Sequence, residues 1–324
     1  MPKTIYPRVG SAELTEFAAD FLSRYAYPEG AKAEFIRLLH RLENENPFAD
    51  KIAETVEKYM FFIDGGIEEA LKSLAQTAET YGENEYTLDF VFVLCCLPLL
   101  KERYSQKGIS EDIFYATCDD LRCKNGECME CKGVPGTFVA SWYHGILAMK
   151  IFMLGRFEYE IYEYSDEEEY TTACGKILYK GSPLLNLHVP SSGISLTDER
   201  RYESYRLAHE FFRDLFPDGK TVFCCNSWLL FPMNKEFLPD GMNIRRFMED
   251  FETVSYKIWE PLNDLWRIFG RYADLPAEKL PTDTALRRAF AERLCSGGTL
   301  GKGFGYIVFD GEKILGKDDA SCVR

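Results

Sequence analysis

The chain has 324 residues, of which 46% are hydrophobic, and 38 basic against 52 acidic side chains give a formal net charge of −14. A single hydrophobic core stops growing at roughly 250 to 300 residues, so this length predicts two domains. The acidic balance argues against nucleic acid or an anionic membrane as the main partner, and an anionic ligand would need a local positive site.

Eleven cysteines raise the question of a secreted, disulfide-bonded protein. The residues after Met1, PKTIYPRVGSAELTEF, contain no apolar signal-peptide core. We therefore expect reduced thiols and a cytoplasmic location. The longest apolar run, Phe90 to Leu100, contains Pro98 and is well short of the ~20 residues that a membrane-spanning helix needs. It predicts a buried helix.

The first part of the chain has the spacing of amphipathic helices, with apolar residues recurring at intervals of three and four. These stripes run from Leu14 to Tyr25, from Phe35 to Leu42, from Ile67 to Ala78 and, after Ser110 and Glu111, from Ile113 to Leu121. Nothing in them alternates like a strand. We predict an all-helical N-terminal domain covering residues 1–145.

After about residue 150 the pattern changes to short alternating segments, beginning with RFEYEIYEY from Arg156 to Tyr164. Further strands are predicted at Lys176 to Lys180, Leu184 to Val189, Thr221 to Cys225, around Ile258 and at Leu265 to Phe269. Helices are predicted at Asp198 to Leu215, Asn243 to Phe251 and Thr284 to Cys295, and a hairpin at Asp310 and Gly311. The fold class is α/β (α+β), with a second domain over residues 146–324.

Four cysteines lie within fourteen residues, in TCDDLRCKNGECMECKG: Cys118, Cys123, Cys128 and Cys131. Cys128 and Cys131 followed by a glycine have the spacing of half a zinc knuckle, whereas the four-residue gap between Cys118 and Cys123 is unusual for zinc ligands. The two alternatives are a structural zinc site and reduced, packed cysteines.

The glycine-rich segment SGGTLGKGFG, Ser296 to Gly305, superficially suggests a nucleotide-binding loop. It lacks the G-x-x-x-x-G-K-[ST] pattern, and it follows a helix and precedes a strand, the reverse of a phosphate loop. We expect a helix stop followed by a tight bend, with a glycine-lined ligand wall as the alternative.

Cys224 and Cys225 on one strand, with His188 on another, are candidates for covalent catalysis. A cysteine nucleophile needs a lowered thiol pKa from a neighbouring cation or helix N-terminus, and sequence does not show spatial neighbours. Buried, inert cysteines are the alternative.

The segment Leu184 to Arg201 has the order strand, Gly/Ser loop, helix, which directs backbone N–H groups outward beside a helix N-terminus. Asn186 and His188 share one face of the strand. Ser195 with Asp198 fits a capping box, and Arg200 and Arg201 stand in the first helical turn, where a bound anion would stabilise them. The alternative is a capped helix with solvated arginines.

Several segments resemble a bacterial acyltransferase family with a helical N-terminal domain and a GNAT-like C-terminal domain. They are LGRFEYE from Leu154, LLNLHVPSSG from Leu184, CCNSWLLFP from Cys224, MNIRRF from Met242 and LPTDTALRRAFAERLCSGG from Leu280. The resemblance implies a mixed β-sheet flanked by helices and splayed beside one strand. It also implies that backbone amides at a strand, loop, helix junction hold the pyrophosphate of acyl-CoA, without a metal.

Carried over to this chain, that junction assigns donor binding to Pro190, Ser191, Ser192, Gly193, Arg200 and Arg201. The usual loop of the superfamily has a basic residue or Gln followed by G-x-G/A, whereas this loop has the single glycine Gly193. An amine would attack the thioester directly, so a proton must be removed and an oxyanion stabilised.

For this chemistry we assign His188 as general base, because histidine titrates near neutrality, with a hydrogen-bonded core histidine as the alternative. Ser227 is assigned as oxyanion donor and Tyr306 as the acid that protonates the leaving thiolate. Asn186 and Trp228 are assigned to the acceptor site.

The expected function is transfer of an acyl group from acyl-CoA, with acetyl-CoA as first choice, to a small-molecule or peptide amine. The acidic surface favours a cationic acceptor such as a polyamine, an aminoglycoside or a basic peptide. One alternative is a non-catalytic ligand-binding or scaffold protein in which the helical domain is the working part. A zinc-dependent module is the other. The sequence predicts no oligomeric state.

Overall fold

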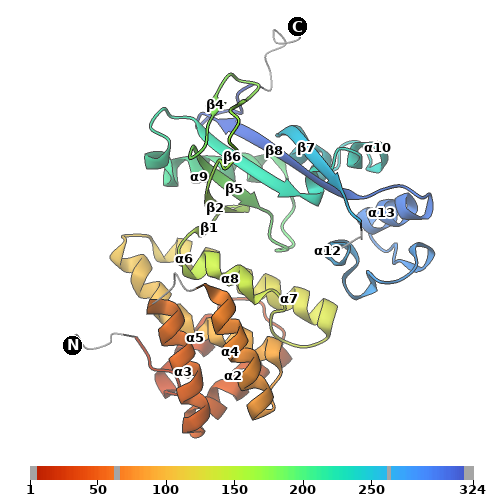
Figure 1. Ribbon diagram of the computed structural model, residues 1–324. Coiled ribbons are helices and arrows are strands. Elements are labelled where there is room, and N and C mark those ends of the chain that lie inside the picture. Colours follow the sequence, from red (N-terminus) through yellow and green to blue (C-terminus); the bar gives the residue numbers. More distant parts are fainter. Residues whose placement is uncertain (1–5, 62–65, 261–263, 317–324) are drawn as a thin grey trace. The chain divides into compact units, whose positions relative to one another are not determined.

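The computed structural model describes residues 6–61, 66–260 and 264–316 (Figure 1). It divides the chain into two compact units, Met1–Phe152 and Met153–Arg324. The first unit is helical and the second contains the main β-sheet, as the change of periodicity near residue 150 predicts.

The helical unit consists of α1 (Ala12–Ser23), α2 (Glu29–Asn44), α3 (Asn46–Phe61), α4 (Ile67–Tyr81), α5 (Glu85–Gln106), α6 (Glu111–Cys118), α7 (Asp120–Lys132) and α8 (Tyr143–Leu147). Helix α5 contacts α1, α2, α3, α4, α6 and α8 and is the centre of this unit. Every residue from Phe90 to Leu100 is buried, so the predicted buried helix is confirmed, Pro98 included. Along the described ranges no helix is long and apolar enough to cross a bilayer.

The cysteine-rich segment forms two helices that meet at Asp119. Cys118, Cys123 and Cys128 are buried and Cys131 is partly exposed. Among the residues that the structure describes, no three His, Cys, Asp or Glu side chains are grouped as a metal ion requires. Three of the four cysteines are thus packed in the interior of the helical unit.

The second unit contains a six-stranded mixed sheet in the order β1-β2-β5-β6-β8-β7 (Figure 1). Its strands are β1 (Ile151–Leu154), β2 (Phe157–Glu163), β5 (Pro183–His188), β6 (Thr221–Ser227), β7 (Glu252–Ile258) and β8 (Gly301–Phe309). Strands β5 and β6 are parallel, whereas the pairs β2–β5, β6–β8 and β7–β8 are antiparallel. The short β3 (Tyr170–Thr171) and β4 (Ile177–Leu178) form a separate two-stranded sheet.

Helix α9 (Asp198–Phe211) covers one face of the main sheet. The ring of Tyr205 stacks on Phe157 with centroids 5.7 Å apart and contacts Phe223 and Phe309 on β6 and β8. Successive residues of a strand point to opposite faces, so the neighbours of Phe157, Phe223 and Phe309 along their strands point to the face that α9 does not cover. That opposite face bears the polar residues of the candidate site.

Short helices lie between the last strands: α10 (Asn234–Phe237), α11 (Asn243–Glu249), α12 (Trp266–Phe269) and α13 (Ala285–Cys295). The predicted strand at Leu265 to Phe269 is wrong, because α12 occupies this segment. Leu265, Ile268 and Phe269 are buried in a core cluster with residues of α13. Their spacing of three and four residues suits one helical face, and a short apolar run does not distinguish helix from strand.

The glycine-rich segment begins as predicted and continues as a strand. Helix α13 does end at Cys295, and Gly297 has a left-handed φ of +75°. The predicted helix stop and bend are confirmed, because Ser296 and Gly297 form a turn in which the amides of Gly297 and Gly298 donate to the Leu294 and Arg293 carbonyls. Strand β8 then begins at Gly301. A Cβ on Gly303 would lie 2.1 Å from the Leu230 carbonyl oxygen, so this glycine permits a close approach of the 3-10 turn η4 (Trp228–Leu230).

The predicted turn after β8 is confirmed in shortened form. The carboxylate of Asp310 accepts hydrogen bonds from the amides of Glu312 and Lys313 at 2.9 and 2.8 Å. The returning segment contributes an isolated bridge between Ile314 and Phe309. The predicted helix from Asp198 likewise ends early, at Phe211, and continues as a 3-10 turn.

Candidate active site

A row of polar side chains crosses the sheet on the face opposite α9. Glu160 on β2 is the Cα partner of Asn186 on β5, Asn186 is the partner of Cys224 on β6, and Cys224 is the partner of Tyr306 on β8. Directly paired residues of neighbouring strands point to the same side. Four strands thus place these chemically active groups on one surface.

His188 lies two residues beyond Asn186, on the same face of β5, as the alternation of LLNLHV predicts. Its Nε2 lies 3.0 Å from Glu160 Oε2, and the Asn186 amide donates to the same oxygen over 3.1 Å. The Asn186 amide nitrogen also lies 3.3 Å from Nε2. When Glu160 is ionised, Nε2 is the donor of the His188–Glu160 pair, because a carboxylate accepts hydrogen bonds and does not donate them. Nδ1 is then the basic nitrogen of the neutral ring.

The side chains of His188 and Glu160 are 24% and 29% exposed, so the pair is sheltered without being sealed from solvent. Glu160 is not among the site residues that the sequence predicts. The alternation of RFEYEIYEY does place Glu158 and Glu160 on one strand face. The antiparallel register of β2 with β5, which brings Glu160 to His188, connects residues 28 positions apart and has no local signal.

Strands β5 and β6 separate next to this pair. In the described sheet they are paired at Leu185 with Phe223 and at Asn186 with Cys224. Beyond these positions β5 continues to His188 and β6 to Ser227, where they pair with their outer neighbours β2 and β8. Strand edges that part in this way turn backbone polar groups toward the opening between them. The site therefore lies where the sheet splays.

The loop after β5 joins this opening to α9. Gly193 has a left-handed φ of +79°, and the Ile194 amide donates to Ser192 Oγ at 3.4 Å. The predicted capping box is wrong: Thr197 is the N-cap residue, and in the described chain its side chain caps no amide. Ser195 Oγ instead accepts a hydrogen bond from Arg200 over 2.8 Å.

The two arginines of the first α9 turn have different environments. Arg200 is exposed. Arg201 is 2% exposed, and it donates from Nε to Asp250 over 2.6 Å and from Nη1 to Asp198 and to the Leu196 carbonyl over 2.9 and 2.8 Å. The positive charge of Arg201 compensates the carboxylates of Asp250 and Asp198, so Arg201 holds the loop in place. Arg200 is an exposed cation in the same helical turn.

Comparison with family models matches both halves of the chain. Residues 16–149 match the N-acyltransferase N-terminal domain, and residues 151–307 match the GNAT-like C-terminal domain. The chain belongs to this acyltransferase family. The resemblance of its second half to a GNAT-like domain, carried by such segments as LGRFEYE and LLNLHVPSSG, is thereby confirmed.

Solved structures share the family's fold. An acyltransferase in complex with decanoyl-CoA and teicoplanin is 21% identical, with 95% of this chain and 91% of that chain covered at a TM-score of 0.72. An acyltransferase mutant in complex with octanoyl-CoA is 20% identical, with 94% and 90% covered at the same TM-score. At these identities the likeness concerns the fold. No curated protein matches the sequence.

Within this GNAT-like domain, Cys224 and Cys225 are poor nucleophiles. Burial raises the pKa of the Cys224 thiol to about 12, with the carboxylate of Glu160 adding to the shift. Burial raises the pKa of the Cys225 thiol as well. Both sulfurs are therefore protonated at neutral pH, whereas covalent catalysis requires a thiolate. The geometry favours the packed-cysteine alternative.

The other predicted residues divide into two groups. Tyr306 stands in the polar row, and burial raises the pKa of its hydroxyl, which stays protonated and able to donate. Ser227 lies three residues beyond Cys224, about 10 Å along the strand, and its hydroxyl accepts from the Leu229 amide. Trp228 packs edge-on against Phe290 in the α13 cluster. The structure thus does not place Ser227 and Trp228 in the row with His188.

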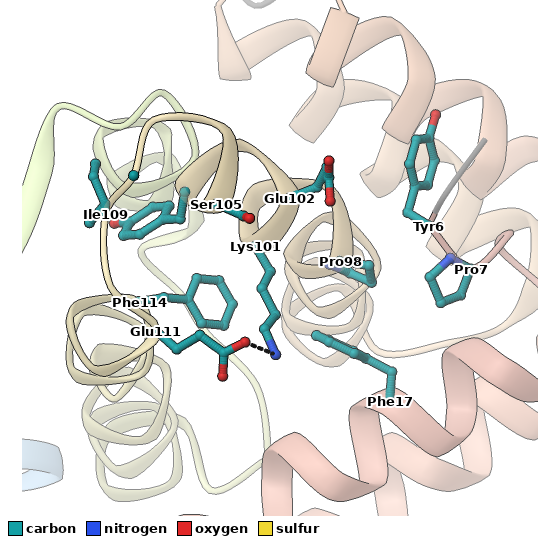
Figure 2. A pocket seen from close by; sticks show the side chains of 12 residues that line it. Tyr6, Pro7, Phe17, Pro98, Lys101, Glu102, Ser105, Ile109, Glu111 and Phe114 are labelled. Carbon is teal, nitrogen blue, oxygen red and sulfur yellow. Dashed lines mark ion pairs between the residues drawn. The ribbon is translucent and has the colours of Figure 1, made fainter. Parts of the chain in front are cut away.

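The family's helical domain contains a separate pocket of about 560 Å³, shown in Figure 2. Phe17 of α1, Pro98 of α5 and Phe114 of α6 form apolar walls. Lys101 makes an ion pair with Glu111 over 3.0 Å at its side. This volume lies in the range of small-molecule sites, and none of the predicted site residues lines it.

Proposed function

We propose that this protein is an N-acyltransferase in which an amine attacks the thioester of acyl-CoA directly. The observation that carries the proposal is the Glu160–His188 pair beside the opening between β5 and β6, in the GNAT-like domain of an acyltransferase family. A sheltered base next to parted strand edges is what aminolysis of a thioester needs, because the base accepts the ammonium proton while backbone donors align the carbonyl.

Each residue has a defined part in this mechanism. The pyrophosphate of the donor lies against the loop from Pro190 to Gly193, with Arg200 as the open cation beside it. Glu160 holds the His188 ring with Nε2 protonated, so that Nδ1 takes the proton from the amine. Tyr306, which remains protonated, donates a hydrogen bond to the departing thiolate. Asn186 orients Glu160 and faces the acceptor.

The acyl chain and the acceptor belong to the same proposal. The structural neighbours hold octanoyl-CoA or decanoyl-CoA, and one of them also holds teicoplanin. This supports a donor range that extends from acetyl-CoA to medium-length chains, and an acceptor that is a small molecule or a glycopeptide with an amine. The net charge of −14 favours an acceptor that is cationic before it reacts.

The test measures the acylated product by mass spectrometry, with acyl-CoA donors from two to ten carbons and a panel of amines. His188→Gln should lower kcat by about 10²- to 10⁴-fold, the usual contribution of a general base. His209→Gln is the matched control, because His209 lies on α9 and contacts Thr221 on the covered face of the sheet. Equal rates in the two variants, or no product with any donor, would refute the proposal.

The pocket in the helical unit favours a second candidate, a ligand-binding protein on an acyltransferase fold. Ser105 is an exposed residue of its rim, so Ser105→Trp fills the space without removing a core side chain. The apolar dye anilinonaphthalene sulfonate should bind the native protein and the Ser105→Ala control, and bind more weakly to Ser105→Trp. Saturable dye binding of this kind in a protein without transferase activity would support the second candidate.

A further inference from the structure

Arg156 occupies the tight turn between β1 and β2, and this turn is anchored to α9. Gly155 adopts a left-handed φ of +71°. The Phe157 amide donates to Ser204 Oγ over 3.2 Å, and Ser204 Oγ in turn donates to the Leu154 carbonyl. Ser204 is a fully buried residue of α9. The turn and the helix are therefore held in register by a single hydroxyl.

The Arg156 side chain reaches from this turn to the loop that follows β5. Nε donates to the Ile194 carbonyl over 2.8 Å, and Nη2 donates to the Pro190 carbonyl over 3.2 Å. The residue is 7% exposed. One rigid guanidinium thus bridges two carbonyl groups four residues apart, which a flexible ammonium does not do with the same geometry.

These contacts decide which way the loop amides point. In a trans peptide the C=O and N–H bonds point in opposite directions. With the Pro190 and Ile194 carbonyls turned to Arg156, the amides of Ser191 and Ser195 are directed to the opposite side. Arg201 holds the Leu196 carbonyl in the same way and so turns the amide of Thr197 outward. The two buried arginines, Arg156 and Arg201, thus donate hydrogen bonds to three carbonyl groups of the loop.

We propose that Arg156 is a positioning residue for the diphosphate of the acyl donor. It orients the peptide groups that carry the amides of Ser191 and Ser195, and it places a buried positive charge behind the loop. In the usual loop of the superfamily, the glycines of the G-x-G pattern let the backbone turn its amides toward the diphosphate. This loop has the single glycine Gly193, and the hydrogen bonds of Arg156 orient the amides instead. The inference rests on the proposed acyl-CoA donor and names its class: a nucleoside diphosphate thioester, in preference to a thioester of pantetheine without the diphosphate.

The test compares two thioesters of the same acyl group, acyl-CoA and acyl-pantetheine, in the full-length protein. Arg156→Lys keeps the charge and loses the bridge between the two carbonyls. We expect Arg156→Lys to weaken acyl-CoA binding by about 10- to 100-fold, the range for hydrogen bonds to a charged group. The KM for acyl-pantetheine and kcat for both donors should stay within about twofold. Arg206→Lys, an exposed residue of α9, is the control.

Arg156→Gln removes the charge as well, so its loss for acyl-CoA should exceed that of Arg156→Lys. Equal losses for both thioesters, or unchanged acyl-CoA affinity in Arg156→Lys, would overturn the inference while the native enzyme still binds acyl-CoA. Native protein that binds no acyl-CoA would refute the proposed function itself, and this inference with it. Loss of the folded sheet domain in both variants, seen by circular dichroism, would assign Arg156 a structural role instead.

Discussion

The ion pair between Arg201 and Asp250 offers the sharpest test of how the loop before α9 is held. Replacing Arg201 by Met removes a guanidinium that is 2% exposed and leaves the carboxylate of Asp250, which is fully buried in the structure, without it. Removing one partner of a buried pair costs about 3–5 kcal/mol, because the remaining charge stays desolvated. For a domain of 150–250 residues this lowers the melting temperature by roughly 6–20 °C.

Two further variants separate the possible roles of this arginine. Arg200→Met should change the unfolding free energy by less than about 0.5 kcal/mol, since Arg200 is exposed. Combining Arg201→Met with Asp250→Asn removes both charges and keeps an acceptor for the Tyr205 hydroxyl, which lies 3.1 Å from Asp250. The combination should recover at least half of the stability, because replacing both partners is close to neutral.

The assay is thermal and urea unfolding of the four proteins followed by circular dichroism, with acyl-CoA affinity measured in parallel. A melting temperature of Arg201→Met equal to that of Arg200→Met would refute the reasoning. If that variant kept its stability and lost acyl-CoA binding, Arg201 would be a ligand contact and not a fastening of the loop.

Three other outcomes are expected. Burial raises the pKa of Asp89 on α5 from 3.8 to about 7, so the folded state keeps this proton to higher pH than the unfolded state. Stability should therefore fall by about 4 kcal/mol as pH rises from about 4 to 7, and urea unfolding of Asp89→Asn should lack this slope. Gly303→Ala should destabilise the folded protein by about 1–3 kcal/mol or more, because the new Cβ would lie 2.1 Å from the Leu230 carbonyl oxygen. Gly126→Ala on α7, where the Cβ meets open space, should stabilise it by about 0.5–1 kcal/mol. Equal unfolding midpoints of the two variants in denaturant would contradict this prediction. A chelator should leave the melting temperature unchanged, since the described residues contain no cluster of three His, Cys, Asp or Glu side chains that could hold a metal ion. A lower melting temperature with chelator would support the zinc-dependent alternative.

Much of the architecture was readable from local pattern. Period 3.6 in the first part predicted α1, α2, α4 and α6 but not α3, and the uniformly apolar run from Phe90 to Leu100 predicted a helix buried on all sides. Period two placed Asn186 and His188 on one strand face. Such features depend on neighbours within one or two turns of chain. The predicted strand at Leu265 to Phe269 was wrong because a five-residue segment with four apolar residues suits a strand and a helix equally.

The site depended on contacts that no local pattern encodes. Glu160 reaches His188 across 28 residues, Arg156 reaches Ile194 across 38, and Arg201 reaches Asp250 across 49. The sequence by itself determined the faces of the strands, the position of the loop and its polar character. The tertiary structure alone decided which charge each side chain meets, because strand register and helix docking bring distant residues within the few ångströms over which hydrogen bonds act.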